Sequence, residues 1–353
     1  MDNAAFYTKS SVLIVGGKGG VGKSTVSAVL ARLAARNGMS VLLIELEGRS
    51  GTSAPAGHHV PTRDVAERSS PGTGDQHFRS APICTRTLTP DDALTEYLID
   101  HGFRRVARRL AKSGMLDVAA TAVPGVRDIL VLSKIVQLER IGTSDLIVVD
   151  GPASGHATRF FTSAQGLLDS SRAGPIRALA ADAVELLRDP TRCQVVLVTS
   201  AEETPVNETV ETVFALADRV GTHLGPVIVN DLYPQIDNLN ADPEAAAVAA
   251  GVVLAPGQAD AMRAAAAFSH HRQTMQCDQR ARLAQALALS QLGLPHLHAE
   301  EIGLLEIDQL VDDLEKELVD PRQPSPRARW IDSTEPAAEQ LISAHPIDEG
   351  LRS

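Results

Sequence analysis

The sequence predicts an α/β fold with a doubly wound, mostly parallel sheet. Short apolar runs of strand length occur along the chain, and the later ones are continuous instead of alternating, as in strands buried on both faces of a parallel sheet. Segments with helical spacing lie between the runs. The predicted strands are 12–16, 41–46, 146–150, 195–199 and 227–230.

The N-terminal unit is predicted to be strand, helix, strand. The apolar run at 12–16 is closed by glycines, and a helix is expected over 24–36. That helix would place four apolar side chains on one face, namely Val26, Val29, Leu30 and Leu33. The second strand follows at 41–46.

Helical signals continue in the C-terminal half of the chain. A helix is predicted to begin near Thr204, with Thr204 as its cap and Pro205 at its first position. Helical spacing recurs over 278–292 and 307–318, and the short segment 295–298 is a candidate final strand. We therefore expect one domain over residues 1–320.

Three stretches depart from this pattern. Residues 48–82 are rich in Gly, Ser, Pro and His and are expected to form a mobile loop. Residues 91–140 indicate two or three helices inserted between strands as a subdomain, and the tail 321–353 is expected to be disordered. No internal repeat indicates a second copy of the domain.

Composition narrows the class of protein. The chain has 353 residues, 44% of them hydrophobic, and a net charge of −11, which disfavours unspecific binding to nucleic acid or anionic lipid. Three cysteines without a CxxC pair fit a reducing cytoplasm. No apolar run approaches the roughly 20 residues that cross a bilayer, and no signal peptide is visible, so we expect a cytoplasmic protein without stable membrane insertion.

Residues 17–24, GKGGVGKS, carry the most specific chemical signal. They match GxxxxGK[ST] between a predicted strand and a predicted helix. The glycines let consecutive N–H groups surround phosphate oxygens, Lys23 would reach the outer phosphates, and Ser24 would ligate Mg²⁺. The alternative interpretation of these glycines, taken without the rest of the motif, is a tight turn between a strand and a helix. The predicted nucleotide-binding residues are Gly17, Lys18, Gly19, Gly20, Val21, Gly22, Lys23, Ser24 and Thr25.

The segment KGGVGKST, with its additional Lys18, resembles the loop of ATPases related to ParA and MinD. Within that superfamily, VVDGPASGHATRF at 148–160 is similar to a segment of ArsA and of the ATPases that target tail-anchored proteins. VTSAEETPVNET, PVIVNDLYP and LPHLHAEEIG follow in the same order, so the resemblance covers about residues 11–318. IELEGRSG and PGVRDIL are closest to an actinobacterial ArsA-like branch whose members tend to occur as two paralogues.

The resemblance implies a function and an assembly. It implies hydrolysis of ATP with Mg²⁺, and closure of a homodimer, or of a heterodimer with an ArsA-like paralogue, over the nucleotide. Lys18 would reach the partner's nucleotide. The protein would then act as a nucleotide-gated switch on a partner or client; the alternatives are a low-turnover ATP-binding module and the ATPase subunit of an arsenite or anion transport system.

Further site residues follow from matching positions. Asp150 resembles the acidic residue that holds Mg²⁺, with a capping Asp as the alternative, and Asn230 resembles the asparagine that reads adenine, with a turn residue as the alternative. Glu202 resembles a glutamate that approaches the nucleotide from the partner subunit. Glu47 stands where the family has the aspartate that orients the attacking water, and Glu45 is its rival because both would point to one strand face.

Departures from the family pattern restrict the partners. Cys277 stands alone where targeting ATPases have a CxxC pair, so no zinc is expected. The helix around 129–138 is apolar on every side, which favours packing within the insert, with a client groove as the alternative. A run of basic residues is interpreted as a solvated helix face, with binding of an anionic partner as the alternative. Its members are Arg104, Arg105, Arg108, Arg109 and Lys112.

Overall fold

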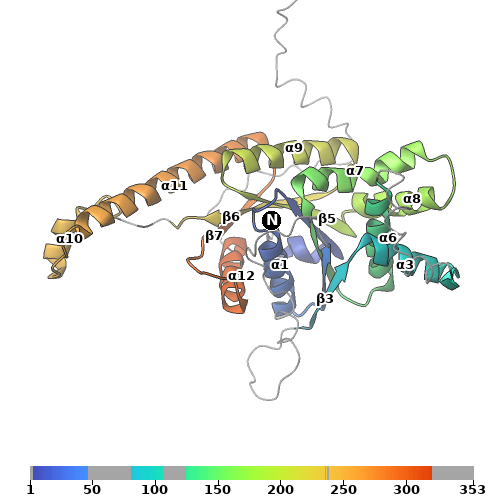
Figure 1. Ribbon diagram of the computed structural model, residues 1–353, viewed down its shortest axis with the longest axis horizontal. Helices are drawn as coiled ribbons and strands as arrows, with labels where there is room; N and C mark the ends of the chain where they lie inside the picture. The colour runs from blue at the N-terminus through green and yellow to red at the C-terminus, as the bar shows by residue number, and fades with distance from the viewer. Residues whose placement is uncertain (1–2, 47–80, 106–124, 235, 237, 320–353) are drawn as a thin grey trace, which may run out of the picture.

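The computed structural model describes residues 3–46, 81–105, 125–234, 236 and 238–319. Within them, seven parallel strands form one sheet in the order β3-β2-β4-β1-β5-β6-β7 (Figure 1). The predicted parallel α/β sheet is therefore confirmed. The strands are β1 (Val12–Gly17), β2 (Val41–Leu46), β3 (Ile83–Leu88), β4 (Leu146–Ala153), β5 (Cys193–Ser200), β6 (Leu224–Leu232) and β7 (Gln291–Pro295).

Helices connect the strands and cover both faces of the sheet. They are α1 (Lys23–Arg36), α3 (Pro90–Asp100), α6 (Val126–Ile141), α7 (Ser154–Ser170), α8 (Pro175–Arg188), α9 (Glu203–Arg219), α10 (Pro243–Ala250), α11 (Gln258–Ala286) and α12 (Leu304–Val319), with a 3-10 helix at Asn3–Thr8. No helix of the described residues is long and apolar enough to cross a membrane.

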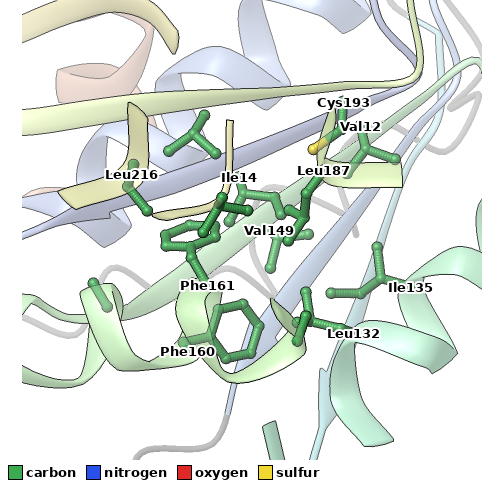
Figure 2. Packing of buried hydrophobic residues seen from close by; sticks show 14 of the residues in the cluster. Val12, Ile14, Leu132, Ile135, Val149, Phe160, Phe161, Leu187, Cys193 and Leu216 are labelled. Atoms are coloured by element: carbon green, nitrogen blue, oxygen red, sulfur yellow. The ribbon is translucent and has the colours of Figure 1, made fainter. Parts of the chain in front are cut away.

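Alternate residues of the central strands belong to two separate cores. Val12 and Ile14 of β1 pack with α6, α7, α8 and α9, where Phe160 and Phe161 lie against the strand side chains (Figure 2). Leu13 and Val15 face the other way and pack against α1, α12 and the 3-10 helix. This alternation of sides is the period of two of a strand, and it explains why the apolar runs are continuous.

The insert is partly described and packs as part of the first core. Residues Ile129 to Leu132, Ile135 and Val136 of α6 are buried, in contact with the cluster that contains α7 and α8. The expectation of packing within the insert is therefore met only in part, because α6 contacts α3 of the insert but also packs against α7 and α8 outside it. Of the basic run, Arg104 and Arg105 are exposed, and the other three residues lie outside the described residues.

Several expected boundaries were wrong. The sequence did not reveal β3, an edge strand whose ICTRTL side chains are mostly polar or only partly buried. α9 begins at Glu203 with Glu202 at its N-cap, so Thr204 lies in the first turn and is no cap. α11 begins at Gln258 and ends at Ala286, and the final strand is β7 at Gln291–Pro295 instead of 295–298.

Other expectations are not tested by the fold. Residues 47–80, most of the loop expected at 48–82, lie outside the described residues, as does the tail 321–353. α12 ends at Val319, close to the expected domain end at 320. The division of the chain into a domain, an insert, a loop and a tail stays a prediction.

Candidate functional site

The candidate site lies where the chain order of the sheet reverses. β1 is hydrogen-bonded to β4 on one side and to β5 on the other, and the chain leaves β1 toward β2 but leaves β4 toward β5. At such a switch point the connections diverge at the carboxyl ends of the strands and leave a crevice for ligands. Residues 18–22, between the end of β1 and the start of α1, form the loop at this point.

Two glycines bring the loop close to its neighbours. Gly17 has a φ of +149°, and a Cβ there would lie 2.2 Å from the carbonyl oxygen of Val198. Gly22 has a φ of +87°, and a Cβ there would lie 2.2 Å from Nδ2 of Asn230. Glycine adopts positive φ without steric cost. The sequence GKGGVGKS therefore supplies glycine where the backbone approaches β5 and the end of β6.

Lys23 opens α1 and is held inside the loop. Its Nζ donates to the carbonyl oxygen of Lys18 at 3.0 Å, which curls the loop over the lysine. Burial lowers the pKa of Lys23, and the carboxylate of Asp150 partly offsets this effect. A partly desolvated cation interacts strongly with phosphate, because water screens it less than it screens a surface lysine.

Asp150, near the end of β4, joins this strand to α1. Its Oδ2 accepts from the Ser24 hydroxyl at 2.6 Å and its Oδ1 accepts from the Ser27 hydroxyl at 3.2 Å. Burial raises the pKa of Asp150, while both hydroxyls and Lys23 act in the opposite direction. Carboxylate and hydroxyl oxygens are ligands that Mg²⁺ prefers, so Ser24 and Asp150 fit this ion.

Of the two carboxylates that are candidates for orienting the attacking water, Glu45 lies within the described residues and Glu47 does not. Glu45 pairs in register with Asp150 across β2 and β4, and its charge adds to the raised pKa of Asp150. Leu43, two residues earlier on β2, packs in the core on the α1 side, so Glu45 follows the same face. Glu47 lies outside the described residues, so its role in orienting water stays a prediction.

Lys18 lies at the rim of the loop. Its Nζ is 3.0 Å from Oε1 of Glu208 on α9, with side chains 31% and 33% exposed. Beside it is a cavity of about 320 Å³, open to solvent and formed by the loop and the start of α9. Its lining residues are Lys18, Gly19, Gly20, Val21, Ser200, Glu202, Glu203, Thr204 and Pro205.

Asn230 is hydrogen-bonded to the phosphate loop, and Glu202 lines the cavity beside it. The Asn230 Nδ2 donates to the carbonyl oxygen of Val21 at 3.0 Å. A carboxamide has a second donor hydrogen and an acceptor oxygen, so this contact is compatible with reading a base edge. Glu202 lines the cavity and is paired at 3.4 Å with Arg272 of α11. Their proposed contacts with nucleotide remain predictions.

A cluster at the ends of β6 and β7 was not foreseen. Tyr233 stacks on His296 with ring centroids 4.6 Å apart, and His298 packs edge-on against both rings. His296 Nδ1 lies 2.6 Å from Oδ1 of Asp231, whose φ is +66°, and Arg272 lies over the Tyr233 ring. The two histidines were visible in the sequence, but their partners come from distant segments.

Other contacts of the site were also missed. Ser27 could have been found, because it follows Ser24 by three residues on the same helix face. Glu208 belongs to the matched segment VTSAEETPVNET, but nothing in that segment indicated its contact with Lys18, and Arg272 lies outside all the matched segments. Among the described residues, no group of three or more His, Cys, Asp or Glu side chains could hold a metal ion.

Comparisons with known proteins agree with this geometry. Residues 12–319 match the model of the CobQ/CobB/MinD/ParA nucleotide binding domain. "ATPase BagA" of Mycobacterium tuberculosis (strain ATCC 25618 / H37Rv) is 34% identical over 228 residues, which are 63% of this chain and 65% of that protein. The alignment thus spans slightly less than two thirds of the relative's length.

More distant relatives carry the names of arsenical pump-driving and Get3 ATPases. A "putative arsenical pump-driving ATPase" of Halobacterium salinarum is 26% identical over 62% of this chain and 35% of its own length. "ATPase get3" of Schizosaccharomyces pombe is 28% identical over 50% of this chain and 52% of its own. These names confirm the resemblance to ArsA and its relatives. Because the family model covers most of the chain, including the loop, β4 and α9, the chain belongs to the CobQ/CobB/MinD/ParA nucleotide-binding domain family.

Proposed function

We propose that the protein is a Mg²⁺-dependent ATPase that dimerises over ATP and acts as a nucleotide-gated switch on a protein partner. The observation that carries the proposal is the convergence of Lys23 and Ser24, at the start of α1, with Asp150, near the carboxyl end of β4, at the loop after β1. The names of the relatives support hydrolysis of ATP as the reaction.

Each group has a task in this reaction. The backbone N–H groups of residues 18–22 and the N-terminus of α1 would bind the phosphates, and Lys23 would balance their charge. Ser24 and Asp150 would hold Mg²⁺, which when bound supplies further neutralisation of the phosphate oxygens. Phosphoryl transfer to water needs little covalent help, so correct placement of these charges is the main requirement.

A carboxylate must also orient the attacking water. We assign this to Glu47, with Glu45 as the rival that lies in register with Asp150. Hydrolysis rates of Glu47→Gln and Glu45→Gln decide between them: the variant that loses turnover while keeping affinity for ATP removes the orienting group. Equal turnover of both variants with wild type would exclude both carboxylates.

The ATPase proposal is tested by nucleotide binding and phosphate release. Wild type should bind Mg-ATP, Lys23→Ala should lose binding, and Asp150→Asn should lose Mg²⁺-dependent hydrolysis by about 100-fold or more. Lys316→Ala is the matched control, because Lys316 is an exposed lysine paired only locally with Asp313. A chain that binds no ATP, or a Lys23→Ala variant as active as wild type, would refute the proposal.

Dimerisation and the switch need separate measurements. With ATPγS in place of ATP to avoid hydrolysis, sedimentation velocity should give a dimer with Mg-ATPγS and not with Mg-ADP, and Lys18→Ala should prevent that dimer. A monomer under both conditions, with a dimer appearing only on addition of an ArsA-like paralogue, would indicate the heterodimer. Mass spectrometry of proteins that co-purify with the ATP-bound form would identify the partner.

A further inference from the structure

The ion pair between Lys18 and Glu208 joins the phosphate loop to a helix that its motif does not include. Lys18 follows β1 directly, and Glu208 lies in the second turn of α9, 190 residues later. Their Nζ and Oε1 atoms are 3.0 Å apart, and each side chain is about one-third exposed. The Lys18 side chain is thus directed to a carboxylate of its own chain.

Both ends of Lys18 are held. Its carbonyl oxygen accepts from Lys23 Nζ at 3.0 Å, while its side chain pairs with Glu208. The backbone contact depends on the lysine that would bind the outer phosphates, and the side-chain contact depends on α9. A ligand that attracts the Lys23 ammonium therefore acts on the backbone contact of Lys18, and one that attracts the Lys18 ammonium acts on its ion pair with Glu208.

α9 presents Glu208 from a fixed position. Val206 and Val213 are buried in the core, and the hydroxyls of Thr209 and Thr212 are bonded to carbonyl oxygens one turn earlier in the helix. Glu208 therefore stays beside the loop, while the lysine side chain can turn about its own bonds. The cavity lined by Lys18, Gly19 and Gly20 lies on the same side of the loop.

We propose that Glu208 is a positioning residue that competes with the outer phosphates of the nucleotide for Lys18. This rests on the proposed function, because Lys18 must contact nucleotide for the competition to matter. A terminal phosphate carries more charge than one carboxylate, so it would draw Lys18 away from Glu208. A partly exposed ion pair is weak, so the exchange needs little free energy, and the carboxylate lowers the affinity for nucleotides that reach Lys18.

A second carboxylate on α9 provides a control for the effect of net charge. Glu211 lies on the same helix one turn after Glu208 and is exposed. Removing either carboxylate changes the net charge by the same amount and alters the field around the loop at long range. Only Glu208 makes the contact with Lys18. A difference between Glu208→Gln and Glu211→Gln therefore reports on the contact and not on net charge.

The test is calorimetric titration of Mg-ATPγS, Mg-ADP and AMP into wild type, Glu208→Gln, Glu211→Gln, Lys18→Ala and the double variant of Lys18 and Glu208. Glu208→Gln should bind ATPγS about three- to five-fold more tightly than wild type, as expected for loss of one partly exposed competing pair. AMP affinity should not change, and Glu211→Gln should match wild type. In the Lys18→Ala background, the substitution at Glu208 should have no effect.

Each other outcome overturns the inference in a recognisable way. If wild type binds ATPγS but Glu208→Gln binds it equally or more weakly, Glu208 does not compete. An equal gain in the Lys18→Ala background, or for AMP, would assign the effect to α9 packing or to net charge. If wild type binds no ATPγS at all, the proposed function fails together with this inference. Thermal unfolding without nucleotide, expected to be the same for Glu208→Gln and wild type, excludes a folding defect.

Discussion

α1 and α11 are both rich in alanine and both border the candidate site, yet they are packed in opposite ways. Nine of the 14 residues of α1 are buried, whereas only Gln276 and Leu283 of the 29 residues of α11 are buried. Figure 1 shows α11 extending away from the sheet, with α10 at its far end. The two helices differ because α1 carries Leu and Val at helical spacing, while the apolar residues in the first half of α11 are mainly Ala, which adds little apolar area to bury.

The difference explains what each helix can do. α1 is fixed between the sheet and α12, so Lys23 and Ser24 at its first turn keep constant positions. α11 is attached through its second half, by the hydrogen bonds of Gln276 and by the buried side chain of Leu283, and its first half has almost only exposed side chains. Packing of the apolar face of α1 therefore fixes the residues of the phosphate site. The second half of α11 binds the backbone at the carboxyl end of β6.

The largest expected effect is on α1. Leu30→Ala should lower the free energy of unfolding by about 2–5 kcal/mol, because Leu30 is fully buried and its removal leaves a cavity in the core. Met262→Ala on α11, where the side chain is 46% exposed, should change it by less than about 0.5 kcal/mol. Chemical denaturation measures both values. Equal losses would show that the two helices are packed alike.

The second effect concerns the attachment of α11. Gln276 accepts from the backbone N–H of Tyr233 at 2.8 Å and donates to the carbonyl oxygen of Asp231 at 2.8 Å. Gln276→Ala should leave two partly buried backbone groups without this partner and cost about 1–3 kcal/mol. Hydrogen exchange should become faster around Asp231 and Tyr233. Gln258→Ala, at the exposed start of α11, is the control and should leave exchange at these residues unchanged.

A smaller loss of stability is expected when the edge-on contact between Phe268 and Tyr233 is removed. The centroids of the two rings are 6.1 Å apart. Phe268→Ala should cost about 0.5–1 kcal/mol, since the side chain is 56% exposed and loses mainly this aromatic contact. Val253→Ser, at a position that is 95% exposed, should cost nothing measurable. A loss above that of Gln276→Ala would mean that the aromatic cluster holds α11 more firmly than its polar contacts do.

The smallest expected change is a gain in stability instead of a loss, and it concerns Asp150, where α1 meets β4. Burial raises the pKa of Asp150, so the folded protein binds this proton more tightly than the unfolded chain does. Ionisation therefore costs stability as the pH rises through the folded pKa. Asp150→Asn cannot ionise, so its Tm relative to wild type should increase with pH.

This prediction is checked by thermal unfolding without nucleotide or Mg²⁺ between about pH 2 and pH 8, a range that includes pH values below the unfolded pKa of an Asp. Asp145→Asn is the opposite control: hydrogen bonds from Ser40 lower the pKa of Asp145, so its ionised form is favoured by folding. The Tm of Asp145→Asn relative to wild type should decrease with rising pH. Parallel curves for both variants would contradict the assigned causes of the two pKa shifts.

Local patterns predicted some elements well and others poorly. The ends of β2 were predicted correctly, and α1 began one residue earlier than expected, because Val, Leu and Ile at regular spacing mark buried faces. The start of α11 was missed by 20 residues, since an exposed Ala-rich helix has no apolar period to detect. β3 was missed because an edge strand with polar residues lacks the continuous apolar run of a central strand.

The sequence by itself determined the phosphate loop, the central strands and the family, because these depend on residues that are close together in the chain. Only the tertiary structure showed that Asp150 joins Ser24 and Ser27, that Asn230 reaches Val21, and which residues contact Arg272. The pairing of Lys18 with Glu208 belongs to this second group. The physical reason is that parallel strands bring their carboxyl ends to one edge, so residues from distant parts of the chain meet there, and no local pattern encodes those contacts.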